Sequence, residues 1–231
     1  MMARKASQRA ASRSWRAIGP LVAGSALVFA LAACTSASRS TSDSFRLLFN
    51  RDVEATPAQV AANRYPQIQL RAPDMSAVMV LGYVDDGQQV WYAGREAVFQ
   101  LDRDGLVTGT SGNGRRISNR IVGDSPFHDL AKVTTPVKVQ RQYDAIPAYA
   151  VSVPVTGTLT RHGTDKVDIL GRQMQLVRFE EQLQGGGIGA TNLYWADATT
   201  GFIWKSRQHL APGYAVELTQ LKPYRTRTAQ D

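Results

Sequence analysis

Polar and apolar residues alternate along much of the second half of the chain. In the stretch over residues 151–160, one side of an extended backbone carries four apolar residues, Val151, Val153, Val155 and Leu159. Because successive side chains of a strand point to opposite faces, this pattern predicts a half-buried strand, and we expect these four side chains to be mostly buried. Such strands are stable only when paired in a sheet, so this pattern constrains the fold more than any other feature.

Similar strand patterns recur from residue 65 onward, separated by short turn signals such as Asp85-Asp86-Gly87. Connections this short favour antiparallel hairpins. Strands are predicted at residues 67–72, 76–84, 88–94, 98–101, 106–107, 151–160, 172–184, 190–196, 202–210 and 214–222. We therefore expect an all-β fold, which is an antiparallel, strongly curved sheet or a β-barrel-like domain of about ten strands.

Three segments depart from the regular strand pattern. A short N-terminal helix is predicted over residues 56–62, because Thr at the N-cap and Pro at the first helical position favour a helix start. Residues 109–126 are rich in Gly, Asn, Ser and Arg, so we expect a long loop there, with at most one helical turn. Within 172–184 the apolar phase shifts by one residue after Leu176, which indicates a β-bulge or strong coiling of the strand.

The front of the chain has a different composition. Residues 1–16 carry five basic residues and no acidic residue, and residues 17–33 are apolar apart from one Ser. A charged region, an apolar region and small residues before a cleavage site are the parts of a secretory signal peptide. The apolar run ends in Leu31-Ala32-Ala33-Cys34, and Cys34 is the only Cys of the chain. This ending resembles a bacterial lipobox, which predicts cleavage before Cys34 and lipidation of its thiol.

The leader divides the chain into three predicted parts. Residues 1–33 are a lipoprotein signal peptide, residues 34–44 are the lipidated Cys and a flexible polar tether, and residues 45–231 are a single β-rich domain. Thr35 follows the Cys, and the absence of an Asp there implies sorting to the outer membrane, facing the periplasm. Two alternatives remain, a signal peptide with an A-x-A cut and an incidental Cys, and a transmembrane anchor.

Charge and composition bear on the class of function. The net charge of +8 comes largely from the leader, because the chain after residue 33 has 22 basic and 19 acidic residues. The remaining +3 is too small to predict a nucleic-acid-binding surface. The three histidines, at 128, 162 and 209, are widely spaced, and the Gly-rich segments lack the Lys-Ser/Thr of a phosphate loop. We therefore expect no metal, no cofactor and no catalytic residue.

Candidate contact residues are aromatic or basic. Tyr92 and Tyr194 each neighbour a Trp, and adjacent strand residues point to opposite faces, so both Tyr side chains are expected to face outward and stack on sugar. The alternative is that they lie at the barrel rim as structural residues. Arg115, Arg116 and Arg120 share the predicted loop and are candidates for contact with an acidic polysaccharide or partner. The alternative is a solvated charge cluster.

Three blocks of sequence together resemble a known family. They are Val80–Tyr83 with Asp86–Trp91, Asp104–Val107, and Asn192–Asp197 with Gly201–Ile203. In this order behind a lipobox, they resemble the YjbF or group 4 capsule polysaccharide (GfcB-type) lipoprotein family, from about residue 45 to residue 222. The resemblance implies a β-barrel-like outer-membrane lipoprotein that helps to make or export capsular or exopolysaccharide. It also implies work beside an outer-membrane β-barrel export protein and a small periplasmic partner, and it brings no catalytic residues.

Three functions follow as hypotheses. The first is a non-enzymatic accessory or binding factor for polysaccharide export, possible sugar binding included. The second is a polysaccharide-modifying enzyme, which needs paired carboxylates in a cleft. The adjacent acid pairs are Asp85-Asp86, in a predicted turn, and Glu180-Glu181, which would point apart on a strand. The third is a periplasmic carrier or assembly factor, which a large apolar cavity would favour and a filled interior would exclude. We expect the first.

Lipidation is testable at the predicted Cys. Cys34→Ser removes the thiol that would carry the diacylglycerol, so we expect an uncleaved or soluble periplasmic form in place of a membrane-held one. Labelling with a fatty acid, followed by membrane fractionation, measures this change directly. A Cys34→Ser chain that is still processed and lipidated in the outer membrane would contradict the prediction.

Overall fold

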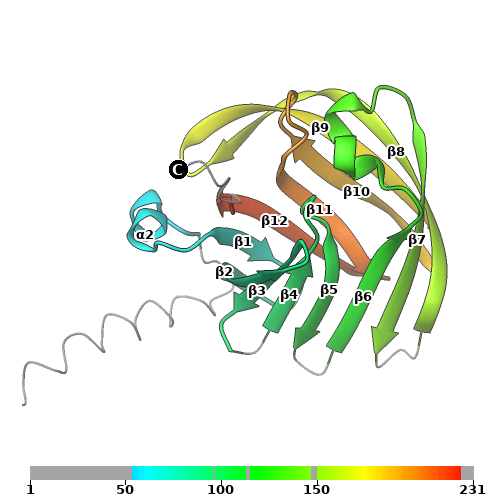
Figure 1. Cartoon of the computed structure of the whole chain (residues 1–231), viewed down its shortest axis with the longest axis horizontal. Coiled ribbons are helices and arrows are strands. Elements are labelled where there is room, and N and C mark those ends of the chain that lie inside the picture. The colour runs from blue at the N-terminus through cyan, green and yellow to red at the C-terminus, as the bar shows by residue number, and fades with distance from the viewer. Residues whose placement is uncertain (1–53, 96, 113–114, 147–149, 225–231) are drawn as a thin grey trace, which may run out of the picture. The chain divides into compact units, whose positions relative to one another are not determined.

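The computed structural model describes residues 54–95, 97–112, 115–146 and 150–224. Within them, twelve strands form a closed antiparallel barrel in which each strand pairs with its sequence neighbours and β1 closes against β12 (Figure 1). The strands are β1 (Gln67–Arg71), β2 (Ser76–Asp85), β3 (Gln88–Ala93), β4 (Ala97–Leu101), β5 (Val107–Gly112), β6 (Arg115–Val122), β7 (Val137–Ile146), β8 (Ala150–Ile169), β9 (Arg172–Gly185), β10 (Ile188–Ala196), β11 (Ile203–Ala211) and β12 (Tyr214–Lys222). The predicted all-β, barrel-like fold is confirmed.

Two short helices accompany the strands in the described residues. The predicted N-terminal helix is α2 (Pro57–Ala62), where Thr56 and Gln59 form a capping box. A 3-10 helix, η1 (Pro126–Lys132), connects β6 to β7. Among the described residues, no helix combines the length and apolar character needed to cross a membrane. The predicted signal peptide, Cys34 and the tether lie outside the described residues.

The prediction of a long loop over residues 109–126 is wrong. This segment holds the end of β5 and the whole of β6, and a helical turn begins only at its end, with η1. Ile117 and Asn119 face the barrel interior and are almost fully buried. The sequence of β6 does not show a clear alternation of apolar and polar residues, because the polar Asn119 takes one of the inward positions. The outward positions hold polar residues, as they do on any solvated sheet face.

The burial predicted on β8 holds for part of the strand. Val155 and Leu159 are buried and Val153 is half-buried, but Val151 is 72% exposed, so the prediction for Val151 is wrong. The pairing of β8 with β7 shifts register near this end, and the neighbouring Ser152 has a positive φ of 51°. This irregular backbone breaks the alternation before it reaches Val151.

The register irregularity predicted near Leu176 is observed. It lies in the pairing of β8 with β9, between Arg161 and Thr164 on the β8 side. Both Leu176 and Val177 are buried there, although they are adjacent on β9. A bulge on the partner strand explains why two successive apolar residues are both covered.

Side chains fill the interior of the described barrel. Trp91, Phe99 and Phe179 are essentially inaccessible to solvent. At one end, η1 inserts Phe127 into the core, where its ring meets the ring of Tyr194 edge to face at a centroid distance of 4.9 Å. Because large side chains occupy the interior, the barrel does not support the hypothesis of a carrier with an apolar cavity.

One charged cluster lies inside the barrel. Arg141 on β7 and Glu181 on β9 are both buried, and their side chains form two hydrogen bonds, Nε to Oε1 at 2.7 Å and Nη2 to Oε2 at 2.9 Å. Tyr194 Oη and Asn192 Nδ2 donate to the same Oε2, at 2.8 and 3.1 Å. Gly157 on the intervening β8 leaves room for the carboxylate, which a Cβ there would overlap. The buried charge pair is thus well supplied with hydrogen bonds, as buried pairs must be.

The room left by Gly157 gives a stability prediction. Gly157→Ala should lower the free energy of unfolding, because the new Cβ displaces the Glu181 carboxylate. Glu181→Ala alone should cost about 3–5 kcal/mol, since it leaves Arg141 buried without its partner. In the Glu181→Ala background the added methyl group should cost less, with a coupling of roughly 0.5–3 kcal/mol. Urea unfolding of the wild type, the two single variants and the double variant measures these free energies.

A second glycine provides the matched control for the comparison of Gly157→Ala with and without Glu181. A Cβ at Gly189 would meet no heavy atom within 4 Å, so Gly189→Ala should have little effect in either background. Equal costs of Gly157→Ala with and without Glu181 would contradict the assignment of the strain to the carboxylate.

Candidate functional site

A polar groove lies on the outer face of the barrel and is lined by residues of β2 to β7. These six strands are neighbours in the sheet (Figure 1). Its volume is about 520 Å³, which lies within the range of about 300–1,000 Å³ that is typical of ligand sites. Its lining residues are Tyr83, Asp85, Asp86, Gln88, Val90, Gln100, Thr108, Ser118, Asn119, Arg120, Gln142 and Asp144. Most of these groups are amides, hydroxyls and carboxylates, so the groove suits a ligand rich in hydroxyl groups.

Strand register explains the shape of the groove. One row of cross-strand partners runs through Tyr83, Val90, Gln100, Gly109, Ser118 and Asp144. Gly109 has no side chain, and a Cβ at this position would lie 2.7 Å from Oε1 of Gln100. Val90 is only 6% exposed although it faces outward. The Gln100 side chain therefore extends over Gly109, and the buried Val90 lies low in the row between larger polar side chains.

Hydrogen bonds between side chains hold the groove in shape. Thr108 lies where the pairing of β4 with β5 shifts register, and its Oγ1 donates to Oε1 of Gln88 at 2.9 Å. On the next strands, the guanidinium of Arg120 donates to Oε1 of Gln142. Each of these bonds connects residues that are distant in sequence, so the barrel itself brings the lining together. Side chains fixed in this way lose less entropy when a ligand binds.

Asp144 has the most constrained carboxylate of the lining. Its Oδ1 accepts the Ser152 backbone N–H at 2.6 Å, and its Oδ2 accepts the Ser118 hydroxyl at 2.9 Å. These two hydrogen bonds, the backbone one first, lower the pKa of Asp144 below its ordinary value of 3.8. The carboxylate therefore stays ionised at neutral pH.

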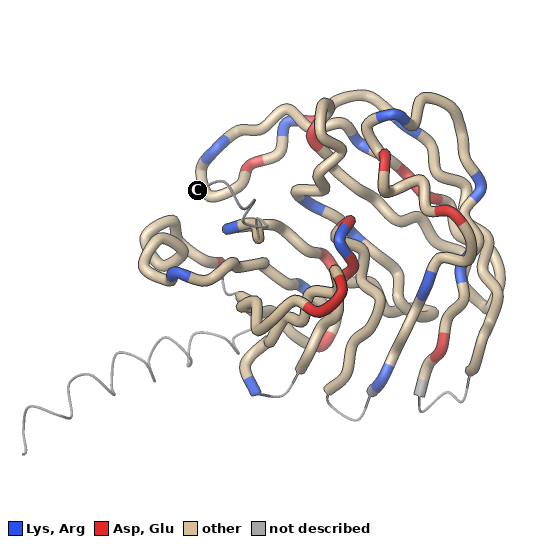
Figure 2. Tube along the Cα trace, in the orientation of Figure 1, with Lys and Arg blue, Asp and Glu red and all other residues tan. Residues whose placement is uncertain are grey.

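The groove carries more acidic than basic side chains. Its lining includes Asp85, Asp86 and Asp144 but one guanidinium, that of Arg120. Elsewhere on the described chain, basic and acidic residues are interspersed along the strands (Figure 2). The local excess of negative charge is therefore a property of the groove, whereas the chain as a whole is basic.

The three candidate arginines do not share a loop, which corrects the sequence prediction. All three lie on the strand β6. Arg116 and Arg120 are exposed on the outer face, four residues apart, and Arg120 lines the groove. Arg115 begins the strand, but its side chain lies outside the described residues. A cluster expected in one flexible loop is instead a feature of one rigid strand.

The two candidate tyrosines differ in orientation. Tyr92 faces outward as predicted and is 41% exposed, beside the groove, with its ring above Gly82. The prediction for Tyr194 is wrong, because this residue is fully buried. Its neighbour Trp195 points outward instead and donates from Nε1 to Oδ2 of Asp165 at 2.9 Å. Burial, together with the charge of Glu181, raises the pKa of Tyr194 well above 10, so its hydroxyl remains a donor to that carboxylate.

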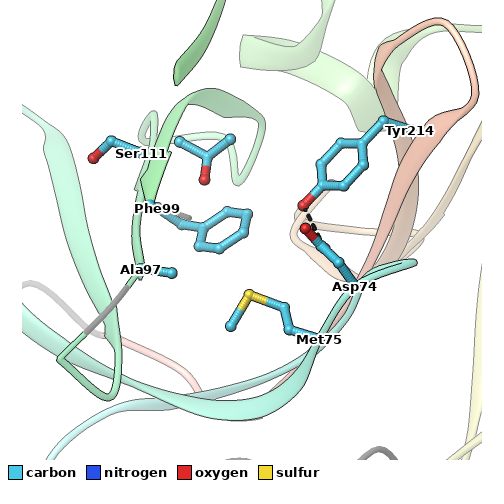
Figure 3. A pocket seen from close by; sticks show the side chains of 8 residues that line it. Asp74, Met75, Ala97, Phe99, Ser111 and Tyr214 are labelled. Atoms are coloured by element: carbon cyan, nitrogen blue, oxygen red, sulfur yellow. Dashed lines mark hydrogen bonds between the residues drawn. The ribbon is translucent and has the colours of Figure 1, made fainter. Parts of the chain in front are cut away.

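A second, smaller hollow lies at one end of the barrel, between the β1–β2 turn and the strands β4, β5 and β12 (Figure 3). The hydroxyl of Tyr214 donates to Oδ1 of Asp74 at 3.0 Å across it. Its volume of about 10 Å³ holds about one water molecule. In the described part of the chain, no group of three or more His, Cys, Asp or Glu side chains is arranged to hold a metal ion.

Sequence reasoning missed most of the groove. Tyr83, Gln100, Gln142 and Asp144 were not among the candidates, although the polar residues at 140, 142 and 144 alternate with residues that are buried. That alternation was the available signal for an outward polar row. The pairing of distant strands was needed to show that these residues meet across the sheet.

Comparison with known proteins relates the chain to a protein family and to a solved structure. A family model described as group 4 capsule polysaccharide lipoprotein gfcB, YjbF, matches residues 24–221. The crystal structure of the hypothetical lipoprotein YmcC from Escherichia coli (K12) is similar, with a TM-score of 0.61 and 21% sequence identity, over 73% of this chain and 89% of that chain. At this sequence identity, the similarity to the YmcC structure shows a shared fold alone. The search of the curated proteins found no match.

The hydrogen bonds of Asp144 predict its titration. The folded-state pKa is depressed, so the stabilisation by these bonds is present above the ordinary Asp pKa and is lost as the pH falls through the folded-state value. Ser118→Ala removes the hydroxyl donor and should raise the pKa of Asp144 toward 3.8. NMR titration of the Asp side chains measures both values. A pKa of Asp144 that does not change in Ser118→Ala would contradict this account.

Proposed function

The chain belongs to the YjbF family of group 4 capsule polysaccharide lipoproteins, and from this membership we propose a specific role. The protein is a non-enzymatic accessory factor in the production and export of capsular or exopolysaccharide, anchored in the outer membrane and facing the periplasm. The observation that carries the proposal is the polar groove on the outer face of a closed barrel. A groove there leaves the filled core undisturbed and remains open to a long polymer, which a pocket inside the barrel would not.

The proposed anchor is the lipid on Cys34. Several acyl chains on one residue hold a protein at a membrane far more firmly than a single chain. The ten residues after it, 35–44, are small and polar and would give a reach of about 15–20 Å. A short flexible tether keeps the local concentration of the domain near the millimolar range. Such a tether favours docking on an outer-membrane β-barrel export protein of the same polysaccharide system.

The electrostatics of the groove favour binding over catalysis. A glycoside hydrolase uses a carboxylic acid with a raised pKa as the general acid and a second, ionised carboxylate. The pKa of Asp144 is shifted in the opposite direction, downward, by the hydrogen bonds from Ser152 and Ser118. Its two oxygens are also engaged by these donors. This carboxylate is therefore suited to hold a ligand by charge and hydrogen bonds, and poorly suited to donate a proton.

The arginines of β6 are proposed as contacts for an acidic partner surface. Arg116 and Arg120 are exposed on one face of a rigid strand, and Arg115 precedes them. Arginine side chains bind carboxylates through paired hydrogen bonds. Their place at one side of the groove would allow a partner to dock beside a bound polymer.

The role is tested by polysaccharide output in a strain that lacks the gene. We expect the wild-type chain to restore surface polysaccharide, and Cys34→Ser to restore much less, because the unanchored domain loses its local concentration at the membrane. The triple change Arg115→Ala, Arg116→Ala and Arg120→Ala should lower output or capture of the export protein while folding and lipidation stay intact.

A single change elsewhere serves as the control for charge removal. Arg172→Ala lies on an exposed position at the start of β9 and should leave output unchanged. Full output from both the triple variant and Cys34→Ser would contradict the proposed anchoring and docking. Turnover of purified polysaccharide by the wild-type chain would contradict the non-enzymatic role.

A further inference from the structure

We propose that the groove over β2 to β7 is a saccharide-binding site that takes a segment of a polysaccharide without acidic groups, and prefers one that carries free amino groups. The inference deepens the proposed function and rests on it in one respect, namely that the natural ligand is the polymer of that system. The preference for a polymer without acidic groups follows from the residues that line the groove. It differs from the sequence-based expectation that the arginines of β6 would attract an acidic polysaccharide.

The lining matches the surface of a sugar chain. Tyr83 is 54% exposed at one end of the row, and the apolar face of a sugar ring packs well on an aromatic ring. The amides of Gln88, Gln100 and Gln142 each offer donors and an acceptor for hydroxyl groups. Val90 provides a small apolar floor. An aromatic platform beside several amides is a combination that suits a ring with one apolar face and a polar rim.

The length and direction of the groove suit a polymer. The row crosses six strands, and neighbouring strands lie about 4.8 Å apart, so it spans roughly 24 Å. A chain lying in it would run across the strands and could leave at both ends. Gly109 lies near the middle of the row, so a side chain there would displace the Gln100 amide that lines the groove.

The charge of the groove decides between classes of polysaccharide. The lining contains three carboxylates and one guanidinium, and that guanidinium already donates a hydrogen bond to Gln142. Asp144 is held in its ionised form by two donors. A uronic acid in the groove would meet net negative charge, whereas an ammonium group would be attracted. Because the lining is solvent-accessible, this preference should weaken as salt increases.

Binding of three defined oligosaccharides tests the assignment. The probes are a glucosamine hexamer with free amines, its fully N-acetylated form, and a galacturonic acid hexamer, each titrated against the full-length chain in detergent by calorimetry at low salt. We expect the amine-bearing hexamer to bind most tightly, the N-acetylated one next, and the acidic one at least roughly tenfold more weakly than the first. Galacturonate binding as tight as glucosamine binding would overturn the charge preference.

Variants locate the binding and separate shape from charge. Tyr83→Ala and Gly109→Val should each weaken binding of the amine-bearing and N-acetylated hexamers about tenfold. The first removes the aromatic platform, and the second displaces the Gln100 amide into the groove. The Gly109 backbone has no positive φ, and the atom nearest its added Cβ is the end of the flexible Gln100 side chain, so this chain should still fold. Phe202→Ala, at an exposed aromatic residue outside the lining, is the matched control and should bind as the wild type does.

A second pair of variants tests the carboxylates. Asp85→Asn combined with Asp144→Asn should remove the preference for the amine-bearing hexamer over the N-acetylated one, while Asp129→Asn, an exposed acid on η1, should preserve it. No binding of any hexamer, or binding unaffected by Tyr83→Ala and Gly109→Val, would overturn the saccharide site. Loss of export-protein capture in Gly109→Val without hexamer binding would likewise overturn it and assign the groove to a protein. The output of Cys34→Ser tests the proposed function independently of all these results.

Discussion

The buried pair of Arg141 and Glu181 fixes the strand register on which the outer surface depends. It joins β7 to β9 across β8, and Asn192 on β10 extends it by accepting the backbone N–H of His209 on β11 at 2.7 Å. A slip of one residue in β7 would expose Arg141 and bury Asp144, since alternate residues face opposite sides. Both changes would leave charge buried without a partner, at a cost of several kcal/mol. The interior network thus determines that Asp144 faces the groove.

The groove itself arises where the sheet departs from regularity. Thr108 is an extra residue in the pairing of β4 with β5, and Gly82 is one in the pairing of β2 with β3, where it lies beneath the ring of Tyr92. Bulges increase local twist and re-aim side chains, and they are frequent beside binding sites. With Gly109 next to Thr108 on β5, these irregular positions produce a hollow on a face that would otherwise be convex and evenly covered.

The sequence predicted helices and strands well where apolar and polar residues alternate regularly, or where cap and turn residues stand at their ends. The capping box of α2, the Asp85–Gly87 turn and most strands follow from local chemistry. The number of short antiparallel strands, together with the family resemblance, predicted a barrel-like fold. The sequence prediction failed at β6, at β7 and at Tyr194, because a barrel interior can hold polar groups when they are hydrogen-bonded. Asn119 and Tyr194 occupy inward positions for that reason. The groove was not predictable because its row joins six strands whose pairing depends on long-range contacts.

The distribution of charge around the groove also bears on how polymer and partner can act together. The groove carries more acidic than basic side chains, while Arg120 at its β6 side and the exposed Arg116, outside the lining, present cations. If one surface bound both ligands, they would compete; with opposite charge on adjacent surfaces, a non-acidic polymer and an acidic protein can bind at once. Charge complementarity contributes mainly to specificity and to the rate of encounter. Because the tether would already supply a high local concentration, each contact can be weak, and a weakly held polymer can move along the groove during export.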